Sequence, residues 1–207
     1  MVRPDLGALS DEALFRSYMN GDYQAFEVLV QRYRRGIYNF VLRSARDKEA
    51  AADLYQEVFL RVVRRSKQYK GESKFSTWLY AIARNICIDH SRRMSHRRHA
   101  SLDAPRGQDS SAGTLLETFR DPSAAVDRRA IDHEIRLKVA EAVESMPEEQ
   151  KEIFLMRQIQ GLSFQEISDI VEIPINTAKS RMRYALERLR EALGAYEEYA
   201  RKAGVGS

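Results

Sequence analysis

Basic side chains gather at two places in the sequence, and their types and spacing indicate a chemistry. One cluster contains almost no acid apart from Asp89; its members are Arg84, Arg92, Arg93, Arg97 and Arg98, interleaved with His90, His96 and His99. The other cluster contains Thr177, Lys179, Ser180, Arg181 and Arg183. Cations at this density are typical of a surface that follows a nucleic-acid phosphate backbone. A solvated helix face is the alternative, and the elements that carry these residues decide between the two.

The second cluster falls inside a segment, residues 163–189, that has the dimensions of a helix-turn-helix. Its first helix, 163–171, is expected to bury three apolar residues: Phe164, Ile167 and Ile170. The apolar residues of its second helix form a stripe that is expected to face the core: Ala178, Met182, Leu186 and Leu189. Short polar and basic residues in the first turns of such a helix reach phosphates and base edges in a DNA major groove. The segment therefore predicts a reader of duplex DNA.

Aromatic residues flank a short polar loop that lies just before the first basic cluster. The loop runs from Tyr69 to Phe75 and reads YKGESKF, and Trp78 and Tyr80 follow it. Aromatic rings beside such a loop can stack on unpaired bases. Phe75 and Trp78 share a helical stripe with Ile82, so core packing is favoured for these two rings. For Tyr80 the sequence leaves core packing and base stacking both open.

A predicted helix over residues 50–65 has two unlike faces. Its core-facing residues are Leu54, Val58 and Val62. Its opposite face carries Asp53, Glu57, Leu60 and Arg64, with Gln56 beside them. Glu57 and Arg61 have the spacing of an ordinary i,i+4 ion pair, and nothing nearby indicates the burial that acid–base catalysis by these carboxylates would need. The apolar Leu60 on a polar face indicates a docking surface for a protein partner.

Several classes of protein are disfavoured by the composition of the 207 residues. Cys87 is the single cysteine, so neither an internal disulfide nor a Cys-based metal site is expected. His96 and His99 have ligand-like spacing but no thiolate or convincing carboxylate near them, so no metal and no cofactor is expected. We find no glycine-rich phosphate loop and no cluster of acids, and therefore expect no catalytic residue, no enzyme activity and no small-molecule substrate. Without a signal peptide or a run of roughly 20 apolar residues, the expected location is the cytoplasm.

The elements that position these residues are predicted to be helical throughout. The fold class is all-α, with one helical domain over 10–94, a flexible polar linker over 95–130 and a second helical domain over 131–200. Leu115, Leu116 and Phe119 are the apolar residues that interrupt the linker. In the second domain Ser145 and Ser163 are each followed by a glutamate three residues later, which predicts two capping boxes at helix starts. Four helices are expected there, the last beginning close to Pro174.

In this order, the pieces resemble the extracytoplasmic-function group of bacterial sigma factors, which keep only the second and fourth sigma domains. The resemblance runs from about residue 11 to 193, and its most specific stretches are AADLYQEVFLRV at 51–62, YKGESKFSTWLYAIARNICIDHSRR at 69–93, and LSFQEISDIVEIPINTAKSRMRYALERLREAL at 162–193. Family members often have glycine where this chain has Glu172 and Asn176, a β-branched residue at Ala178 and a basic one at Tyr184. These departures concern the preferred promoter sequence.

The resemblance implies a function and a set of site residues. It implies binding of core RNA polymerase, both to the β′ clamp helices and to the β subunit, with the clamp-helix contact through Asp53, Gln56, Glu57 and Leu60. It implies recognition and melting of the promoter minus-ten element through the loop Lys70, Gly71, Glu72, Ser73 and Lys74 and through Arg84, Asn85, Arg92 and Arg93. It implies reading of the minus-thirty-five element through Thr177, Lys179, Ser180, Arg181, Arg183 and Tyr184. An anti-sigma factor, of a kind that is often membrane-anchored, is an expected partner, and a conventional helix-turn-helix regulator is the alternative function.

Overall fold

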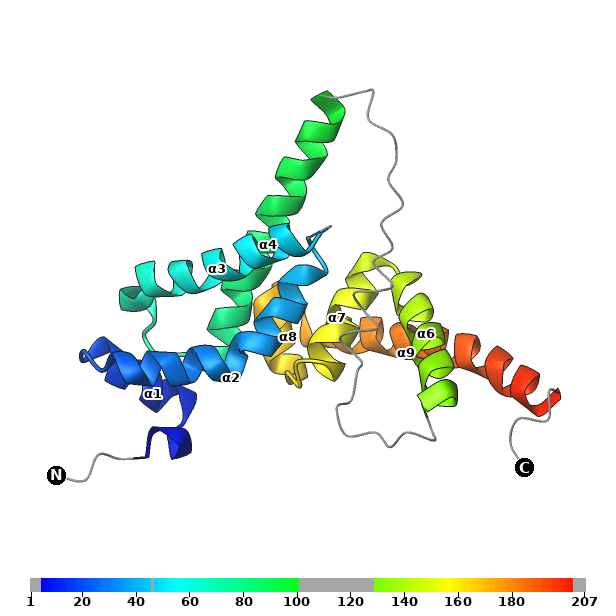
Figure 1. Cartoon of the computed structure of the whole chain (residues 1–207), viewed down its shortest axis with the longest axis horizontal. Helices are drawn as coiled ribbons and strands as arrows, with labels where there is room; N and C mark the ends of the chain where they lie inside the picture. The colour runs from blue at the N-terminus through cyan, green and yellow to red at the C-terminus, as the bar shows by residue number, and fades with distance from the viewer. Residues whose placement is uncertain (1–4, 46, 101–128, 203–207) are drawn as a thin grey trace. The chain divides into compact units, whose positions relative to one another are not determined.

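The computed structural model describes residues 5–45, 47–100 and 129–202, and every regular element in these ranges is a helix (Figure 1). This confirms the all-α fold class. The chain divides into two compact units, Met1–Gln108 and Asp109–Ser207. Within the described ranges no helix is both long enough and apolar enough to cross a membrane.

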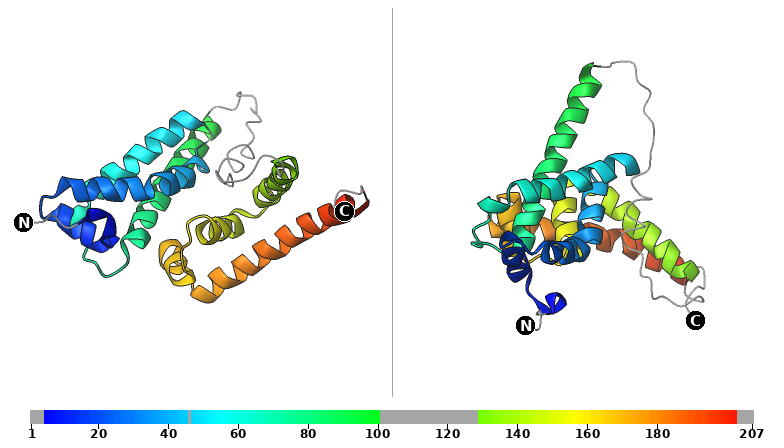
Figure 2. Two further views of the ribbon diagram at one scale, coloured as in Figure 1. Left: turned by 60° about the horizontal axis from the view of Figure 1, so that its bottom comes forward. Right: turned by 60° about the vertical axis from the view of Figure 1, so that its left-hand side comes forward.

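Residues 5–45 and 47–100 of the N-terminal unit form four α-helices and two short 3-10 helices. Their bounds are η1 Leu6–Ala8, α1 Asp11–Met19, α2 Tyr23–Leu42, α3 Lys48–Arg64, η2 Ser66–Gln68 and α4 Phe75–Ala100. Ser10, Asp22 and Asp47 cap α1, α2 and α3, each accepting a hydrogen bond from an amide of the first turn. The helix α2 packs against α1, α3 and α4, and the C-terminal part of α4 extends beyond the other helices of the unit (Figures 1 and 2).

The N-terminal unit combines buried aliphatic side chains with a network of aromatic rings. Every aromatic residue from Phe15 to Tyr80 belongs to one connected set of ring contacts. Phe15 is central, with ring centroids 5.0 Å from Phe75, 5.3 Å from Tyr69 and 5.5 Å from Trp78. Tyr80, which the sequence left open, is 3% exposed, so it is a core residue and cannot stack on a base. The predicted core position of Phe75 is confirmed.

Residues 129–202 of the C-terminal unit form four α-helices, the number that the sequence predicted. They are α6 Arg129–Glu144, α7 Glu148–Gln158, α8 Phe164–Val171 and α9 Ile175–Lys202, and α9 packs against the other three (Figure 2). The largest fully buried side chains here are aliphatic or sulfur-containing: Ile153, Leu155, Met156 and Ile167. The residues that α9 buries are mostly small, namely Ala178, Met182 and Ala185.

Three sequence expectations for the C-terminal unit meet different outcomes. Ser163 forms the predicted capping box with Glu166. Ser145 does not, because α7 begins after Pro147, and the Ser145 hydroxyl donates instead to the carbonyl of Ala142 at 2.8 Å. The predicted placement of Leu186 in the core stripe of α9 is wrong, since Leu186 is 40% exposed and Ala185 takes the buried position next to it.

The predicted linker falls mostly outside the described residues. Within the range 95–130, the helix α4 continues to Ala100 and α6 begins at Arg129. Leu115, Leu116 and Phe119 lie outside the described residues, as do the side chains of Arg97 and Arg98. The boundaries 10–94, 95–130 and 131–200 therefore remain a prediction.

Candidate functional site

The outer face of α3 carries the first set of predicted site residues. Asp53 and Gln56 are exposed, and Leu60 is 50% exposed, while the opposite side of the helix buries Leu54, Val58 and Val62. Glu57 accepts a hydrogen bond from Arg61 at 2.6 Å, so the predicted i,i+4 ion pair is present. The four predicted residues thus share one accessible helix face, as their spacing required.

Sequence reasoning missed one member of this face. Val63 lies three residues after Leu60 on α3 and is 41% exposed, so the two side chains are neighbours on the helix surface. The signal was present in the sequence, because Val63 falls outside the stripe of Leu54, Val58 and Val62. Together Leu60 and Val63 form an apolar patch beside Asp53 and Gln56, a combination suited to binding another protein.

The polar loop Lys70–Lys74 is fully displayed to solvent. All five of its residues are exposed, and Gly71 adopts a left-handed backbone with φ of 76°. The Tyr69 hydroxyl donates to the Ser73 carbonyl at 2.7 Å and closes the loop across its base. The Tyr69 ring lies 5.0 Å from Trp78, and burial raises its pKa above the ordinary tyrosine value. The loop is therefore anchored in the aromatic core while its own five residues are exposed to solvent.

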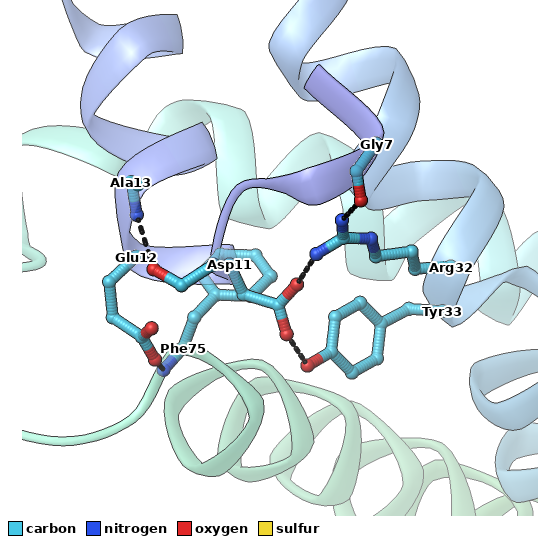
Figure 3. A network of polar contacts seen from close by, with 8 residues as sticks. Gly7, Asp11, Glu12, Ala13, Arg32, Tyr33 and Phe75 are labelled. Atoms are coloured by element: carbon cyan, nitrogen blue, oxygen red, sulfur yellow. Dashed lines mark hydrogen bonds and ion pairs between the residues drawn. The ribbon is translucent and has the colours of Figure 1, made fainter. Parts of the chain in front are cut away.

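The helix α4 starts directly after this loop, and its first amide is capped from another helix. Lys74 occupies the N-cap position, since the Trp78 amide donates to its carbonyl at 3.2 Å. The Phe75 amide donates to a carboxylate oxygen of Glu12, on α1, at 3.0 Å (Figure 3). No signal in the sequence connects Glu12 to the loop, because the two positions are 63 residues apart.

Asp11, next to Glu12, fixes the start of α1 to α2. Its carboxylate accepts a hydrogen bond from Arg32 at 2.6 Å and another from the Tyr33 hydroxyl, and Arg32 also donates to the Gly7 carbonyl at 2.6 Å (Figure 3). Burial, and next the hydrogen bond to Asp11, raise the pKa of Tyr33 well above its ordinary value. Tyr33 is therefore a permanent donor at neutral pH, and the network is a fixed part of the unit.

Further along α4 lie the remaining residues predicted for the minus-ten surface. Asn85 is exposed and Arg84 is half-buried one position before it. Arg92 and Arg93 are exposed on the part of α4 that extends beyond the other helices, and the Arg93 Nε–H donates to the Asp89 carbonyl at 3.2 Å (Figure 1). The loop and α4 together present a row of polar and cationic groups that leads from the loop outward along one helix.

The turn between α8 and α9 has helix-turn-helix geometry. Glu172 ends α8 in a left-handed conformation, with φ 59° and ψ 46°, which is the position where glycine is commoner. The Ile173 amide donates to the Ser168 carbonyl at 3.2 Å, and the Ser168 hydroxyl donates to the Ile173 carbonyl at 2.6 Å. These two bonds lock the turn, so α9 starts in a fixed direction after only three intervening residues.

The first turns of α9 expose part of the predicted reading surface. Lys179, Arg183 and Tyr184 are exposed, with the Arg183 guanidinium 5.0 Å from the Tyr184 ring centroid. Asn176, also exposed, joins this surface and was not among the predicted contacts. In the DNA-binding motifs of this kind, such side chains enter the major groove.

Three other predicted residues of α9 have contacts inside the protein. Arg181 pairs with Glu149 of α7 at 2.5 Å, on a different side of the helix from Lys179 and Arg183. The Ser180 hydroxyl, half-buried, donates to the Thr177 carbonyl at 3.0 Å. The structure therefore brings Lys179, Arg183 and Tyr184 together and sets Arg181 apart from them.

In the part of the chain that the structure describes, no three His, Cys, Asp or Glu side chains gather as ligands for a metal ion. The described residues form two surfaces rich in cations, the loop with α4 and the first turns of α9. They also form one mixed apolar and acidic surface, the outer face of α3. Such surfaces suit the binding of phosphates, bases and a protein partner.

Comparison with known proteins assigns both units. Residues 29–98 match Sigma-70 region 2, and residues 136–189 match Sigma-70, region 4. The ECF RNA polymerase sigma-E factor of Escherichia coli K12 is 31% identical over 186 residues, which cover 89% of this chain and 93% of the relative. The RNA polymerase sigma-H factor of Pseudomonas aeruginosa is 29% identical over 184 residues, covering 88% and 93%.

Solved structures share the fold. The sigma factor RpoE of Bartonella quintana, crystallised with the anti-sigma factor NepR, matches with a TM-score of 0.64 and 18% identity, covering 82% of this chain and 96% of that one. CnrH, solved with the cytosolic domain of CnrY, matches with a TM-score of 0.62 and 17% identity, covering 89% and 97%. With both sigma regions matched in order, and a relative above 30% identity over nearly its whole length, the chain belongs to the extracytoplasmic-function family of RNA polymerase sigma factors.

Proposed function

We propose that this sigma factor binds core polymerase through the outer face of α3 and reads a promoter with two further surfaces, the loop with α4 and the first turns of α9. The observation that carries the proposal is the exposed face of α3. It combines an apolar patch, Leu60 and Val63, with the acidic Asp53 on a helix whose other side is fully buried. Apolar surface at such an exposed position has no role in the unit's own core and suits a docking contact with the β′ clamp helices.

At the minus-ten element, the exposed loop Lys70–Lys74 captures one unstacked base together with Asn85. Arg84, Arg92 and Arg93 hold the neighbouring phosphates along α4. Pulling a base out of a duplex costs a few kcal/mol, and its contacts in a protein pocket offset that cost. Melting is then driven by binding energy, so this chain supplies no catalytic residue and hydrolyses no nucleotide.

At the minus-thirty-five element, the start of α9 enters the major groove. Lys179 and Arg183 supply the cations, and Asn176 adds an amide that can bond to base edges. We assign Arg181 a lesser share in base reading than its neighbours, because it is already paired with Glu149.

Neither DNA surface needs high affinity by itself. When core polymerase holds both units, binding at one promoter element makes binding at the second intramolecular, with an effective concentration in the millimolar range for short linkers. The chain thus acts where the polymerase is, in the cytoplasm, and gains promoter affinity only as a polymerase subunit.

An anti-sigma protein is the further partner that we propose. Both RpoE of Bartonella quintana and CnrH were solved with a binding partner, in the first case one named as an anti-sigma factor. A protein that covers Leu60 and Val63 would compete with core polymerase for this chain. Finding the chain bound to polymerase at all times, in unstressed cells as in stressed ones, would count against such a partner.

The test of the function is reconstitution with bacterial core polymerase. The variant Glu57→Lys with Leu60→Ala should lose co-elution with the core enzyme and lose initiation on a promoter library. A matched control, Glu27→Lys with Leu186→Ala, makes the same two chemical changes at exposed positions away from α3 and should retain both. If the unmodified chain fails to associate with core polymerase yet binds specific duplex DNA alone, the conventional regulator replaces the sigma mechanism.

A further inference from the structure

The loop Lys70–Lys74 has two ends, and the structure holds each of them differently. At the first end, the Tyr69 ring packs against Trp78 at 5.0 Å and against Phe15 of α1 at 5.3 Å, while its hydroxyl bonds to Ser73. At the second end, the chain enters α4 at Phe75, whose side chain is buried against the same Phe15 at 5.0 Å. Both ends of the loop therefore rest on α1.

The start of α4 lacks the residues that usually stabilise a helix N-terminus. Lys74 stands at the N-cap, where Ser, Thr, Asp and Asn are preferred, and its charge has the same sign as the positive end of the helix dipole. The first turn of α4 contains no acidic residue. A helix start of this composition needs an acceptor and a negative charge from elsewhere.

Glu12 supplies both. Its carboxylate accepts the Phe75 amide at 3.0 Å, so the first N–H of α4 is satisfied by a charged acceptor on another helix (Figure 3). Glu12 itself cannot shift freely, because the adjacent Asp11 is bound to Arg32 and Tyr33. The carboxylate therefore stands at a fixed point relative to α2 as well as α1.

From this geometry we infer that Glu12 is a positioning residue for minus-ten recognition: it fixes the junction of the loop with α4 and so sets where the loop meets the captured base. This inference rests on the proposed role of the loop. Glu12 does not touch DNA in this scheme, and acts through the Phe75 amide. The helix α4 also carries Asn85. If the start of α4 were not fixed, the side-chain amide of Asn85 would be misplaced relative to the loop as well.

The experiment measures base discrimination by holoenzyme reconstituted from core polymerase and the full chain. Fork-junction DNA probes, single-stranded over the minus-ten element, differ only at the captured base, and the ratio of their dissociation constants is the readout. Glu12→Ala should reduce this ratio about tenfold, since the part-buried Phe75 amide loses its charged acceptor. The dissociation constants for core polymerase, bound through α3, and for a minus-thirty-five duplex, bound through α9, should stay within twofold of the wild-type values.

Two comparisons separate positioning from mere stability. Glu12→Gln keeps an oxygen acceptor at the same distance from the backbone and should retain most of the base discrimination. Glu12→Asp keeps the charge, but its side chain is one methylene too short, so this variant should lose the base discrimination. Ser10→Ala removes the neighbouring cap of α1 and lowers the unfolding temperature, but leaves Glu12 in place and should leave the ratio unchanged. These milder variants distinguish a positioning role of Glu12 from a purely stabilising one even if Glu12→Ala does not fold.

The outcomes are distinct. Unchanged discrimination in Glu12→Ala and Glu12→Asp, or an equal loss in Ser10→Ala, overturns the positioning role. The double variant Lys70→Ala with Glu72→Ala tests the loop itself on the same probes. If that loop variant leaves discrimination unaltered, the proposed loop function fails; if it abolishes discrimination while the Glu12 variants do not, the positioning role alone fails.

Discussion

The two units of this sigma factor hold their candidate DNA-binding residues by contacts of very different range. In the N-terminal unit, the polar contacts that hold the start of α1 and, through Glu12, the start of α4 join residues 63, 25, 22 and 21 positions apart; the bond from Tyr69 to Ser73, which closes the loop, spans 4. In the helix-turn-helix, the capping box and the bond from Ser168 to Ile173 span 3 and 5 positions. The junction of the predicted base-capturing loop with α4 is thus held from distant parts of the unit, while the turn before α9 is closed by neighbouring residues. The helix α9 itself is also tied to α7 by the pair of Arg181 with Glu149, 32 positions apart.

The cores differ in the same sense. A connected set of aromatic rings runs beside the aliphatic core of the N-terminal unit, so one ring such as Phe15 contacts residues that are distant in sequence. Aliphatic residues fill the C-terminal unit, and α9 meets it through small side chains such as Ala178 and Ala185. Truncation of an aromatic ring should therefore destabilise the whole N-terminal unit, whereas removal of a helix cap should destabilise only the first turn of its own helix.

The largest effect is expected from Phe15→Ala. Phe15 is 1% exposed and touches both ends of the loop, so its removal should destabilise the N-terminal unit by about 3–5 kcal/mol. Hydrogen exchange on the full chain should show lost protection in α1 and α4 and unchanged protection in α6 to α9. Ile167→Ala, in the other core, should give the reverse pattern, and an equal loss in both units after Phe15→Ala would break the comparison.

Alkaline pH should lower the stability of the N-terminal unit through its buried tyrosines. Burial raises the pKa of Tyr80 above its ordinary value of about 10, so folding favours the neutral phenol. That contribution is complete below about pH 10 and is lost as pH rises further, by about 1.4 kcal/mol per pH unit, because the unfolded chain ionises first. Tyr33 shifts in the same direction and adds to the effect.

The fluorescence of Trp78, the one tryptophan of the chain, reports unfolding of the N-terminal unit. Its thermal midpoint should fall steeply between about pH 10 and 11.5, and the fall should be shallower in Tyr80→Phe. Identical slopes in the variant and the wild type would show that tyrosine burial does not set the alkaline stability of this unit.

A smaller, local effect is expected at the caps. Ser163→Ala should cost the C-terminal unit about 1 kcal/mol, because the Glu166 amide loses its acceptor. Ser145→Ala has the same sequence spacing to a glutamate but no capping role, and should cost less than about 0.5 kcal/mol. Exchange rates of the first amides of α8 provide the measurement, and equal costs for the two serines would contradict the assignment of helix starts.

The smallest effect, opposite in sign, is expected at the turn. Glu172 holds a left-handed backbone that costs a non-glycine residue about 1–2 kcal/mol, so Glu172→Gly should stabilise the C-terminal unit by about 0.5 kcal/mol after the entropy that glycine loses on folding. Gly71→Ala, at φ 76° in the loop with open space around it, should instead destabilise. Chemical denaturation of both variants, followed by circular dichroism, should show shifts of opposite direction.

Local signals in the sequence predicted most of the C-terminal unit. The capping box at Ser163 and the helix-turn-helix were correct because the relevant contacts lie within five residues. The errors have local causes as well: Pro147 starts α7 later than the Ser145 spacing suggested, and Ala185 outcompetes Leu186 for the buried position because it lies closer to the line of Ala178 and Met182.

The N-terminal unit was predictable in fold but not in how its loop is held. Helical periodicity placed Leu54, Val58 and Val62 correctly, and thereby also the exposed face of α3. Periodicity left Tyr80 undecided, because a ring at a stripe position fits both a core and a stacking platform. The bond from Phe75 to Glu12 had no sequence signal, since a single glutamate in a first turn is explained by its own helix.

The bond between Glu12 and Phe75 also sets an order of events during synthesis. Glu12, in α1, leaves the ribosome before its hydrogen-bond partner, the Phe75 amide, which is synthesised 63 residues later. The loop therefore reaches its final form only when the aromatic core closes around it, whereas the turn at Glu172 can form as soon as its flanking residues exist. In a nascent chain, the predicted minus-ten surface is therefore complete only when its whole domain has folded, whereas the turn before the predicted reading helix is complete once its own residues have been made.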